Sequence, residues 1–416
     1  MTEKQVEKAP QKKKRKPVDP NSASYKLGKI VADAYREAQE AKDRGEPVGW
    51  CASNFPQEIF ETLGLKVVYP ENQAAAIAAR GQGGELCEYA ESQGYSNDIC
   101  AYARISLAYL DIKDVPAQNM PQPDFVLCCN NICNCMIKWY ENIARERNIP
   151  LIMVDIPFNS NYEVSDQQVA YVAAQFWDAV HQLEEITGRK WDDEKFKKVM
   201  EISNRASKAW LKATEYSQHT PSPFSGFDLM NHMAVAVCAR GTEAAAEAFE
   251  TLCEEYEQNV KEGKSTFKGE EKQRIMFEGI ACWPHLRTTF KGLKDRGMNM
   301  VSTIYADAFA YIYDDFEGLC RAYCKVPNAI SMELARDKRV DLAKLSKAEG
   351  LLVHTNRSCK LWSGFMYEMS RQIGEECDIP VASFDGDQAD PRNFSPAQYD
   401  TRVQALSEII AERKGN

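Results

Sequence analysis

Blocks of apolar residues alternate with amphipathic stretches over the first third of the chain. The apolar blocks, which predict short buried strands, span residues 48–52, 65–69, 124–129 and 150–156. The amphipathic stretches, which predict helices, span residues 24–44, 56–63, 71–79, 85–93, 97–110 and 133–147. Short buried strands that alternate with helices indicate a parallel sheet, because crossover helices cover both of its faces.

The pattern changes between about residues 165 and 262. Long amphipathic stretches such as 193–216 and 242–260 have no convincing strand between them, which predicts a helical region. Alternation then resumes, with strands predicted at residues 274–280, 298–305, 350–355 and 380–384 and helices at 285–295, 332–345, 363–377 and 395–414. Ser24 can cap the first predicted helix, and Ser395 and Pro396 suit the cap and the first turn of the last one.

Two segments repeat the same order of strand, Asn, Cys, helix and Ile-Pro. FVLCCNNIC (residues 125–133) is followed by a helix and NIPLIMVDIP, and LLVHTNRSC (residues 351–359) is followed by a helix and DIPVASFDGD. Asn130 therefore matches Asn356, and Cys133 matches Cys359. Upstream of each lies a weaker pair, in which GWCASNFPQEIFETLGLKVVYP and EGIACWPHLRTTFKGLKDRGMNMVSTIY share strand, Cys, Pro, helix, strand and Tyr.

These patterns predict an α/β fold with two related parallel-sheet domains, Rossmann- or flavodoxin-like, and a helical domain between them. The expected divisions are a disordered tail (1–20), a first α/β domain (21–164), the helical domain (165–270) and a second α/β domain (271–416). A chain of 416 residues is too long for one compact core. The cleft between two such domains is a natural ligand site, since the carboxyl ends of their strands can face each other.

Charge and cysteine content narrow the function. The net charge of −10 argues against a nucleic-acid partner, because phosphate binding favours a basic surface. Because the sequence has neither an apolar run of 18 residues nor a secretory signal, we expect a cytoplasmic protein with no membrane span. The 14 cysteines then favour reduced thiols and metal ligation. The basic run QKKKRK (residues 11–16) is interpreted as a solvated tail rather than a nuclear import signal.

Three cysteines stand where helices are predicted to begin. Cys133 and Cys359 each follow a strand, and Cys100 opens a helix in DICAYAR. Free backbone N–H groups and the helix dipole stabilise a thiolate at such a position, and thiolate is the form that binds metal. Three or four thiolates are needed for a cubane iron–sulfur cluster, although the run CCNNICNC matches neither ferredoxin spacing nor a zinc finger.

Most other cysteines are interpreted as small buried hydrophobes, namely Cys87, Cys128, Cys238, Cys253, Cys320, Cys324 and Cys377. The roles of Cys129 and Cys135 stay open. Cys282, next to His285, fits either a fourth ligand with a base or packing beneath the cleft. His354 is expected inside its strand, and FDGDQADPR (residues 384–392) is expected to be a loop braced by ion pairs, at a possible subunit interface.

Segments throughout the chain beyond about residue 45 resemble the α-type subunits of the 2-hydroxyacyl-CoA dehydratase family. They are VGWCASNFPQE, VVYPENQAAA, DICAYAR, PDFVLCCNNICN, KWYENIAR, IPLIMVD, SPFSGFDL, GEEKQRIMFEGIACWP, NRSCK and FDGDQADPRNF. The resemblance implies a lyase of anaerobic amino-acid fermentation that converts an (R)-2-hydroxyacyl-CoA to an (E)-2-enoyl-CoA and water. The implied mechanism uses a ketyl radical. One electron added to the thioester carbonyl expels the neighbouring hydroxyl group, and the resulting enoxyl radical has a much more acidic C3 proton.

The same resemblance implies the residues of the site. Cys100, Cys133 and Cys359 align with three ligands of a 4Fe–4S cluster, whose fourth iron is then open to water, hydroxide or substrate oxygen. Ser53 is implied to lie beside that iron, and Glu71 is a candidate proton acceptor, with iron-bound hydroxide as the alternative. Taken alone, the two residues fit a helix cap and a helix-start acid. The implied partners are a homologous β subunit and an ATP-dependent iron–sulfur activator, in keeping with the lack of a P-loop in this chain.

Two other functions remain compatible with the sequence. One is an iron–sulfur reductase subunit of the benzoyl-CoA reductase type, in which the electrons stay in the product. The other is a non-catalytic subunit that holds a closed cluster and relays electrons. The acyl group also stays open among lactoyl, isocaproyl and aryllactyl groups, as do the proton acceptor and the oligomeric state beyond a heterodimer.

Overall fold

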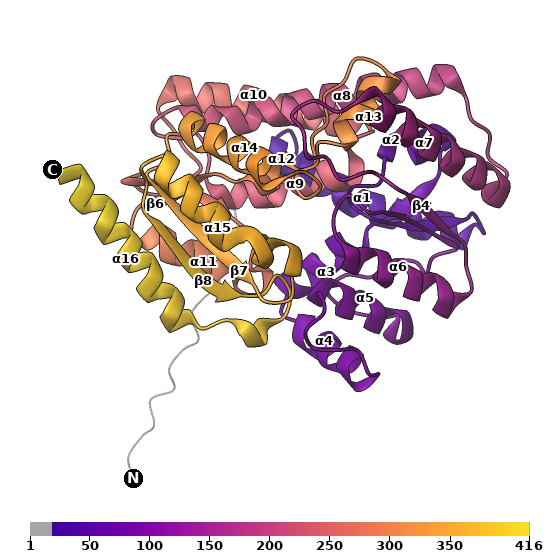
Figure 1. Cartoon of the computed structure of the whole chain (residues 1–416), viewed down its shortest axis with the longest axis horizontal. Helices are drawn as coiled ribbons and strands as arrows, with labels where there is room; N and C mark the ends of the chain where they lie inside the picture. The colour runs from indigo at the N-terminus through magenta and orange to yellow at the C-terminus, as the bar shows by residue number, and fades with distance from the viewer. Residues whose placement is uncertain (1–18, 416) are drawn as a thin grey trace, which may run out of the picture.

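The structure, a computed structural model, describes residues 19–415. The predicted disordered tail therefore lies almost wholly outside the described residues, and the basic run QKKKRK lies entirely outside them. Two parallel sheets and many helices form the molecule, which confirms the predicted α/β class (Figure 1). Within the described residues, no helix combines the length and the apolar character needed to cross a membrane.

The two sheets have the same topology. The first contains β1 (Val48–Cys51), β2 (Lys66–Val68), β3 (Phe125–Cys129) and β4 (Leu151–Val154), in the order β2-β1-β3-β4. The second contains β5 (Gln273–Glu278), β6 (Met298–Ser302), β7 (Gly350–Asn356) and β8 (Val381–Gly386), in the order β6-β5-β7-β8. All neighbouring strands are parallel. The segments that repeat in sequence are thus the equivalent inner strands β3 and β7, each with its following helix.

Helices of the first half connect and cover its sheet. They are α1 (Ala23–Asp43), α2 (Gln57–Leu63), α3 (Pro70–Ala79), α4 (Gly83–Ser92), α5 (Ala101–Ile112) and α6 (Asn134–Arg147). The first of these is capped by Ser22, whose side chain accepts from the Tyr25 N–H, so the expected cap at Ser24 is wrong. Helix α5 begins at Ala101 rather than near residue 97, which makes Cys100 its cap residue.

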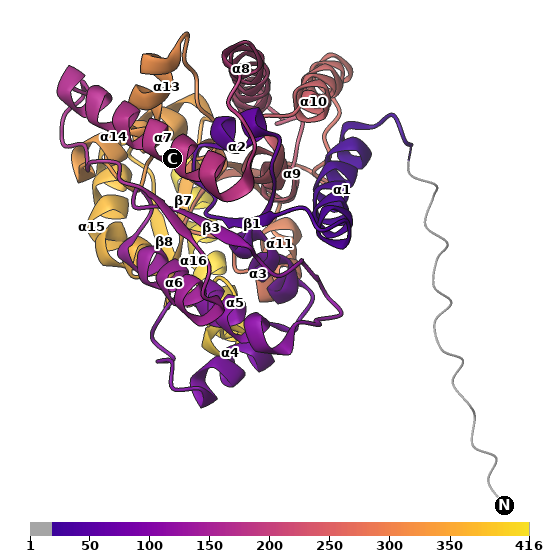
Figure 2. The same cartoon turned by 90° about the vertical axis from the view of Figure 1, so that its right-hand side faces the viewer.

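Four long helices follow, as the amphipathic stretches predict. They are α7 (Asp166–Thr187), α8 (Asp193–Glu215), α9 (Gly226–Ala239) and α10 (Glu243–Glu262). Helices α8 and α10 pack side by side at the top of the molecule (Figure 1, Figure 2). Helix α1 packs against α9 and α10, where the Ala23 N–H donates to Glu255 at 2.8 Å. The domain boundaries stay predictions.

The second half adds six helices to its sheet. They are α11 (Leu286–Asp295), α12 (Ile304–Asp307), α13 (Phe316–Tyr323), α14 (Met332–Leu345), α15 (Lys360–Glu376) and α16 (Pro396–Gly415). The strand expected at 298–305 ends at Ser302, because the Thr303 hydroxyl caps α12 by accepting from the Tyr305 N–H. Helix α13 was not expected from the sequence. The Ser395 hydroxyl accepts from the Gln398 N–H, which confirms the predicted cap of the last helix.

A buried ion pair ties the helical region to helices of both halves. The Glu58 carboxylate in α2 accepts from Ser203 of α8 at 2.6 Å and from Tyr323 of α13 at 2.9 Å. Arg240, at the end of α9, lies 3.4 Å from the same carboxylate, and both charged side chains are buried. Burial raises the pKa of Glu58, but Arg240 and these hydroxyl groups reverse the effect and hold it below its ordinary value.

The start of α5 docks against the loop that follows β7. The Ala101 N–H donates to the Ser358 hydroxyl at 3.0 Å, and Lys360 pairs with Asp98 at 2.6 Å. One turn further along α5, the buried Arg104 pairs with Asp390 at 2.9 Å. These contacts bring the cap residue of α5 next to the cap residue of α15, although the two are far apart in sequence.

Candidate functional site

The three cysteines predicted as ligands line one cavity. Cys100, Cys133 and Cys359 are the cap residues of α5, α6 and α15. All three have free thiols, are partly buried, and face a cavity of about 100 Å³ between the two halves of the chain. Two of the thiols come from the first half and one from the second, so the cavity is complete only when the halves are docked.

Burial controls the charge of these thiols. It raises the pKa of Cys133 to about 11 and that of Cys359 to about 12, and it also raises the pKa of Cys100. In each case a backbone N–H three residues further on opposes the rise; these are the N–H groups of Ala103, Met136 and Trp362. The thiols are therefore protonated near pH 7 but face helix N-termini that favour thiolate once a cation displaces the proton.

A fourth thiol reaches the same cavity. Cys135, in the first turn of α6, lines it and raises the pKa of Cys100. Cys129 lies fully buried in β3 and outside the cavity lining, and Cys282 is 2% exposed and likewise outside it. Of the three cysteines whose roles the sequence left open, only Cys135 is therefore at the site.

Ser53 and Glu71 meet at one end of the cavity. The Ser53 backbone N–H and hydroxyl both donate to one oxygen of the Glu71 carboxylate, at 2.9 and 2.8 Å. The Tyr140 hydroxyl donates to the other oxygen at 2.9 Å. Burial raises the pKa of Glu71, and the hydrogen bonds from Ser53 and Tyr140 oppose this rise. Ser53 is not a helix cap, because α2 begins after Pro56.

A second, larger cavity opens onto the same place. It has a volume of about 580 Å³ and runs between α1, α3 and α9. Five residues line both cavities and so mark their junction: Ser53, Glu71, Tyr102, Tyr305 and Phe309. At this junction the Trp283 indole N–H donates to the Tyr102 hydroxyl at 2.5 Å. Burial raises the pKa of the neighbouring Tyr305 hydroxyl, and the nearby Glu71 and Cys359 raise it further.

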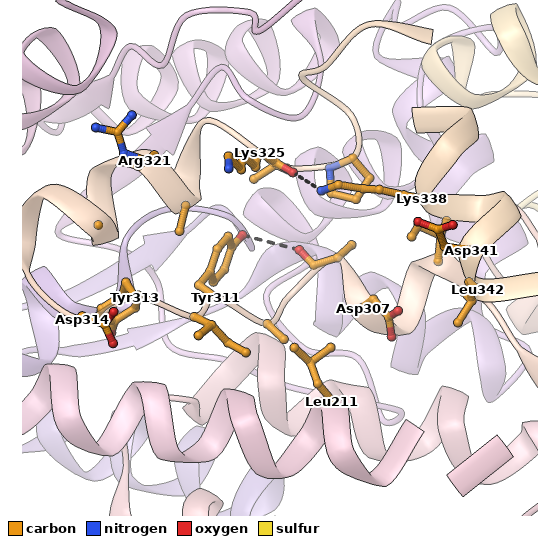
Figure 3. Close-up of a pocket in the computed structure, with 18 of the residues that line it drawn as sticks. Leu211, Asp307, Tyr311, Tyr313, Asp314, Arg321, Lys325, Lys338, Asp341 and Leu342 are labelled. Carbon is orange, nitrogen blue, oxygen red and sulfur yellow. Dashed lines mark hydrogen bonds between the residues drawn. The ribbon is translucent and has the colours of Figure 1, made fainter. Parts of the chain in front are cut away.

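A third cavity, larger than both of these, lies elsewhere. It has about 880 Å³, is lined by α12, α13 and α14, and shares only Ala308 with the cysteine cavity (Figure 3). Burial raises the pKa of Asp307 to about 7 and lowers that of Lys338, whose ammonium donates to the Lys325 carbonyl at 2.8 Å. None of the residues predicted from sequence lies there, and no cysteine lines it.

The other polar residues picked out from sequence are structural. His354 stays within β7, stacks on Phe384, and bonds to the Ile280 carbonyl at 2.5 Å. His285 stacks on Phe394 rather than facing the cysteines. The first three residues of FDGDQADPR end β8 rather than lying in a loop, but the segment is braced by ion pairs as predicted, through Asp390 to Arg392 and to Arg104 of the first half.

Sequence reasoning missed Tyr102, Tyr140 and Tyr305 as site residues. Two positional signals were present. Tyr140 lies seven residues, or two helical turns, after Cys133, and Tyr305 occupies the place of Tyr69 in the weaker repeat. Neither signal identifies a function, because each hydroxyl gains its partner only through tertiary packing.

Comparison with known proteins decides the family. A family profile described as 2-hydroxyglutaryl-CoA dehydratase, D-component, matches residues 52–410. This chain belongs to that family. It is 59% identical to the (R)-phenyllactyl-CoA dehydratase alpha subunit of Clostridium sporogenes over 96% of this chain and 98% of the relative. It is 47% identical to the alpha subunit of the (R)-2-hydroxyglutaryl-CoA dehydratase of Acidaminococcus fermentans, over 94% and 98% of the two chains.

A more distant relative has a different reaction. A benzoyl-CoA reductase subunit of Thauera aromatica is 26% identical over 94% of this chain and 95% of its own length. The much higher identity to dehydratase alpha subunits places this chain with the dehydratases, as a hydro-lyase subunit. The resemblance noted in the sequence is thereby confirmed.

Proposed function

We propose that this chain is the α subunit of an ATP-activated, radical (R)-2-hydroxyacyl-CoA dehydratase that forms (E)-2-enoyl-CoA and water. Its cofactor is a 4Fe–4S cluster held by Cys100, Cys133 and Cys359. One observation carries the proposal. Three thiols from two related half-structures converge on one cavity, and that cavity meets the larger cavity between α1, α3 and α9, called the channel from here on, at Ser53 and Glu71.

The donor set fits such a cluster. Between residues 19 and 415, no three His, Cys, Asp or Glu side chains gather tightly enough to hold a single metal ion. A cluster of several irons spans a wider cage of thiolates, and Cys ligation is typical of it. The cavity wall also includes the buried indole N–H of Trp139, which has no partner among the described residues, and an amide of Gln388 that donates to the Cys100 sulfur at 3.4 Å. Such donors suit the sulfurs of a cluster.

The bound cluster would supply a low-potential electron and an iron with an open coordination position. The channel suits the rest of the substrate. Small residues of α1 and α3 line its walls, namely Gly28, Ala32, Ala75, Ala76 and Ala79, and Arg80 lies at the end of α3. A cavity of about 580 Å³ with such walls has room for the pantetheine arm of a CoA thioester, and Arg80 is placed to meet a phosphate group. Relatives whose names specify CoA thioesters support this substrate class.

Glu71 is the proposed proton acceptor. One electron added to the thioester carbonyl allows the C2 hydroxyl to leave, and the resulting radical has an acidic C3 proton. That proton passes to the Glu71 carboxylate, and the electron returns from the product, so the reaction is redox-neutral overall. Ser53 and Tyr140 hold the carboxylate in place and favour its ionised form.

The proposed partners are a homologous β subunit and a separate ATP-driven iron–sulfur protein that supplies the first electron. The alpha-subunit names of four relatives support a multi-subunit enzyme. Cys135 favours a second function, in which four thiolates close the cluster and the chain relays electrons without binding substrate.

An anaerobic assay separates these functions. The αβ complex with activator, ATP and reductant is mixed with (R)-phenyllactyl-, (R)-lactoyl- or (R)-2-hydroxyisocaproyl-CoA. We expect enoyl-CoA from at least one of them, with reductant consumed only to start the reaction. Consumption of reductant in proportion to product would indicate a reductase. A Cys135→Ser complex that keeps both iron and activity supports three-thiolate ligation, whereas loss of its iron would favour the relay.

A further inference from the structure

The junction between the two cavities has two tyrosine hydroxyl groups, those of Tyr102 and Tyr305, with no hydrogen-bond acceptor found among the described residues. Of its polar residues, Ser53 donates to Glu71, and Glu71 accepts from three groups. Tyr102 accepts from the Trp283 indole, which has only a donor, so the Tyr102 proton is free to point to Tyr305. The two hydroxyls lie close enough to shift each other's pKa: Tyr102 lowers that of Tyr305, and Tyr305 raises that of Tyr102, the pattern expected when Tyr102 is the donor. The proton of Tyr305 is left for a ligand.

We propose that Tyr305 is a catalytic residue that donates a hydrogen bond to the thioester carbonyl oxygen of the substrate, and that Trp283 and Tyr102 orient it. The inference rests on the proposed function. Tyr305 is partly exposed, at the point where the channel and the cysteine cavity meet. Its neighbours there include both Glu71 and Cys359. A thioester that enters through the channel therefore meets Tyr305 where the channel joins the cysteine cavity.

The chemistry requires a donor at this position. When one electron from the iron–sulfur partner enters the thioester, negative charge develops on the carbonyl oxygen. Glu71 and the cysteine sulfurs would repel that charge, whereas a neutral phenol stabilises it. Tyr305 keeps its proton throughout, so no bond to the residue forms or breaks. Aligned hydrogen-bond donors strengthen one another in a buried site. A chain of donors from Trp283 through Tyr102 to Tyr305 therefore strengthens the hydrogen bond that Tyr305 donates to the substrate.

The chain also crosses between the two halves. Tyr102 lies in α5, two residues after Cys100, while Trp283 and Tyr305 follow β5 and β6 of the second sheet. Docking of the halves that completes the set of cysteines therefore also completes the donor chain. Because Tyr102 belongs to the first half and Trp283 and Tyr305 to the second, Tyr305 is oriented as a donor only when the two halves are docked.

The test uses the anaerobic αβ complex without activator, so that substrate binds but does not react. The probe is (R)-phenyllactyl-CoA with ¹³C at the thioester carbonyl, observed by isotope-edited infrared spectroscopy. We expect the bound carbonyl band to lie below that of the free thioester and to move back up in Tyr305→Phe. Tyr102→Phe and Trp283→Phe should move it in the same direction by less. With activator, Tyr305→Phe should lower kcat about 100-fold with little change in KM, as for loss of one oxyanion donor.

The matched control is Tyr256→Phe, which removes a buried hydroxyl of α10 that has no partner among the described residues and lies outside both cavities. If Tyr305→Phe loses iron, the shifts in Tyr102→Phe and Trp283→Phe decide the question. An unchanged carbonyl band in the variants, with substrate bound, would overturn the role of Tyr305 alone. Failure of the unsubstituted complex to bind any of the three 2-hydroxyacyl-CoA thioesters would overturn the proposed function and this inference with it.

Discussion

Ser53 holds Glu71 by two hydrogen bonds to a single carboxylate oxygen, from its backbone N–H at 2.9 Å and its hydroxyl at 2.8 Å. The other oxygen is held by Tyr140, so the carboxylate is fixed on both sides in a site where it is 8% exposed. When it is ionised, a carboxylate buried and fixed in this way lowers the stability of the folded protein, and such groups concentrate at functional sites.

Replacing Glu71 with Gln should abolish most of the dehydratase activity. The amide keeps the shape of the side chain but cannot accept a proton, so kcat should fall by about 100- to 10,000-fold, the usual contribution of a general base. Steady-state kinetics of the anaerobic complex measure this. Glu61→Gln is the control, because Glu61 is a carboxyl of α2 outside the cavity lining. Equal activity of the two variants would exclude Glu71 as the acceptor.

Removing the Tyr140 hydroxyl should shift the pH dependence of kcat. Burial already raises the pKa of Glu71, and the Tyr140 hydrogen bond opposes that rise. A base is active when ionised, so activity falls as the pH drops through its pKa. Without the hydrogen bond the pKa rises further, and Tyr140→Phe should lose activity at a higher pH than the unsubstituted enzyme. A pH–rate profile with an unmoved acidic limb would contradict this.

Each of the substitutions Cys100→Ala, Cys133→Ala and Cys359→Ala should remove most of the iron that this chain binds. The three sulfurs line the cavity at equivalent helix starts, and a cubane cluster needs at least three protein thiolates. Iron and acid-labile sulfide content of the anaerobic complex give the readout. The control is Cys377→Ala, at the end of α15 and outside the cavity. Full iron content in Cys133→Ala would remove that residue from the ligand set.

Replacing Arg240 with Met should destabilise the fold without touching the site. Glu58 would be left buried and without its cationic partner, which costs about 3–5 kcal/mol. Chemical denaturation of the isolated chain measures the change, which should appear as a lower midpoint. The double variant with Glu58→Gln should recover part of the loss, because it also removes the buried charge. A midpoint equal to that of the unsubstituted chain would show that the pair contributes nothing.

The repeat made the larger architecture predictable. Matching Cys133 to Cys359 placed both after equivalent strands, and the two sheets do share one strand order. Local rules failed where two candidates compete within a few residues. Ser22 caps α1 in place of Ser24, and Thr303 turns the chain into α12 before the expected end of the strand.

The polar part of the site depended on contacts that no local pattern encodes. Trp283 and Tyr102 are 181 residues apart, and Tyr140 and Glu71 are 69 apart. Periodicity indicates which face of an element is buried but does not say which hydroxyl meets which carboxylate. Ser53 and Glu71 were assigned only through the family resemblance, since taken alone they fitted a helix cap and a helix-start acid.

The central claim is that three thiolates of this chain hold an iron cluster with one position open to a 2-hydroxyacyl-CoA. Mössbauer spectroscopy of the anaerobic ⁵⁷Fe-loaded complex, before and after addition of (R)-phenyllactyl-CoA, tests it most directly. We predict that one iron of this chain differs from the others and that its signal changes when substrate binds. Iron signals that stay the same with substrate bound, or a chain without iron, would contradict the claim.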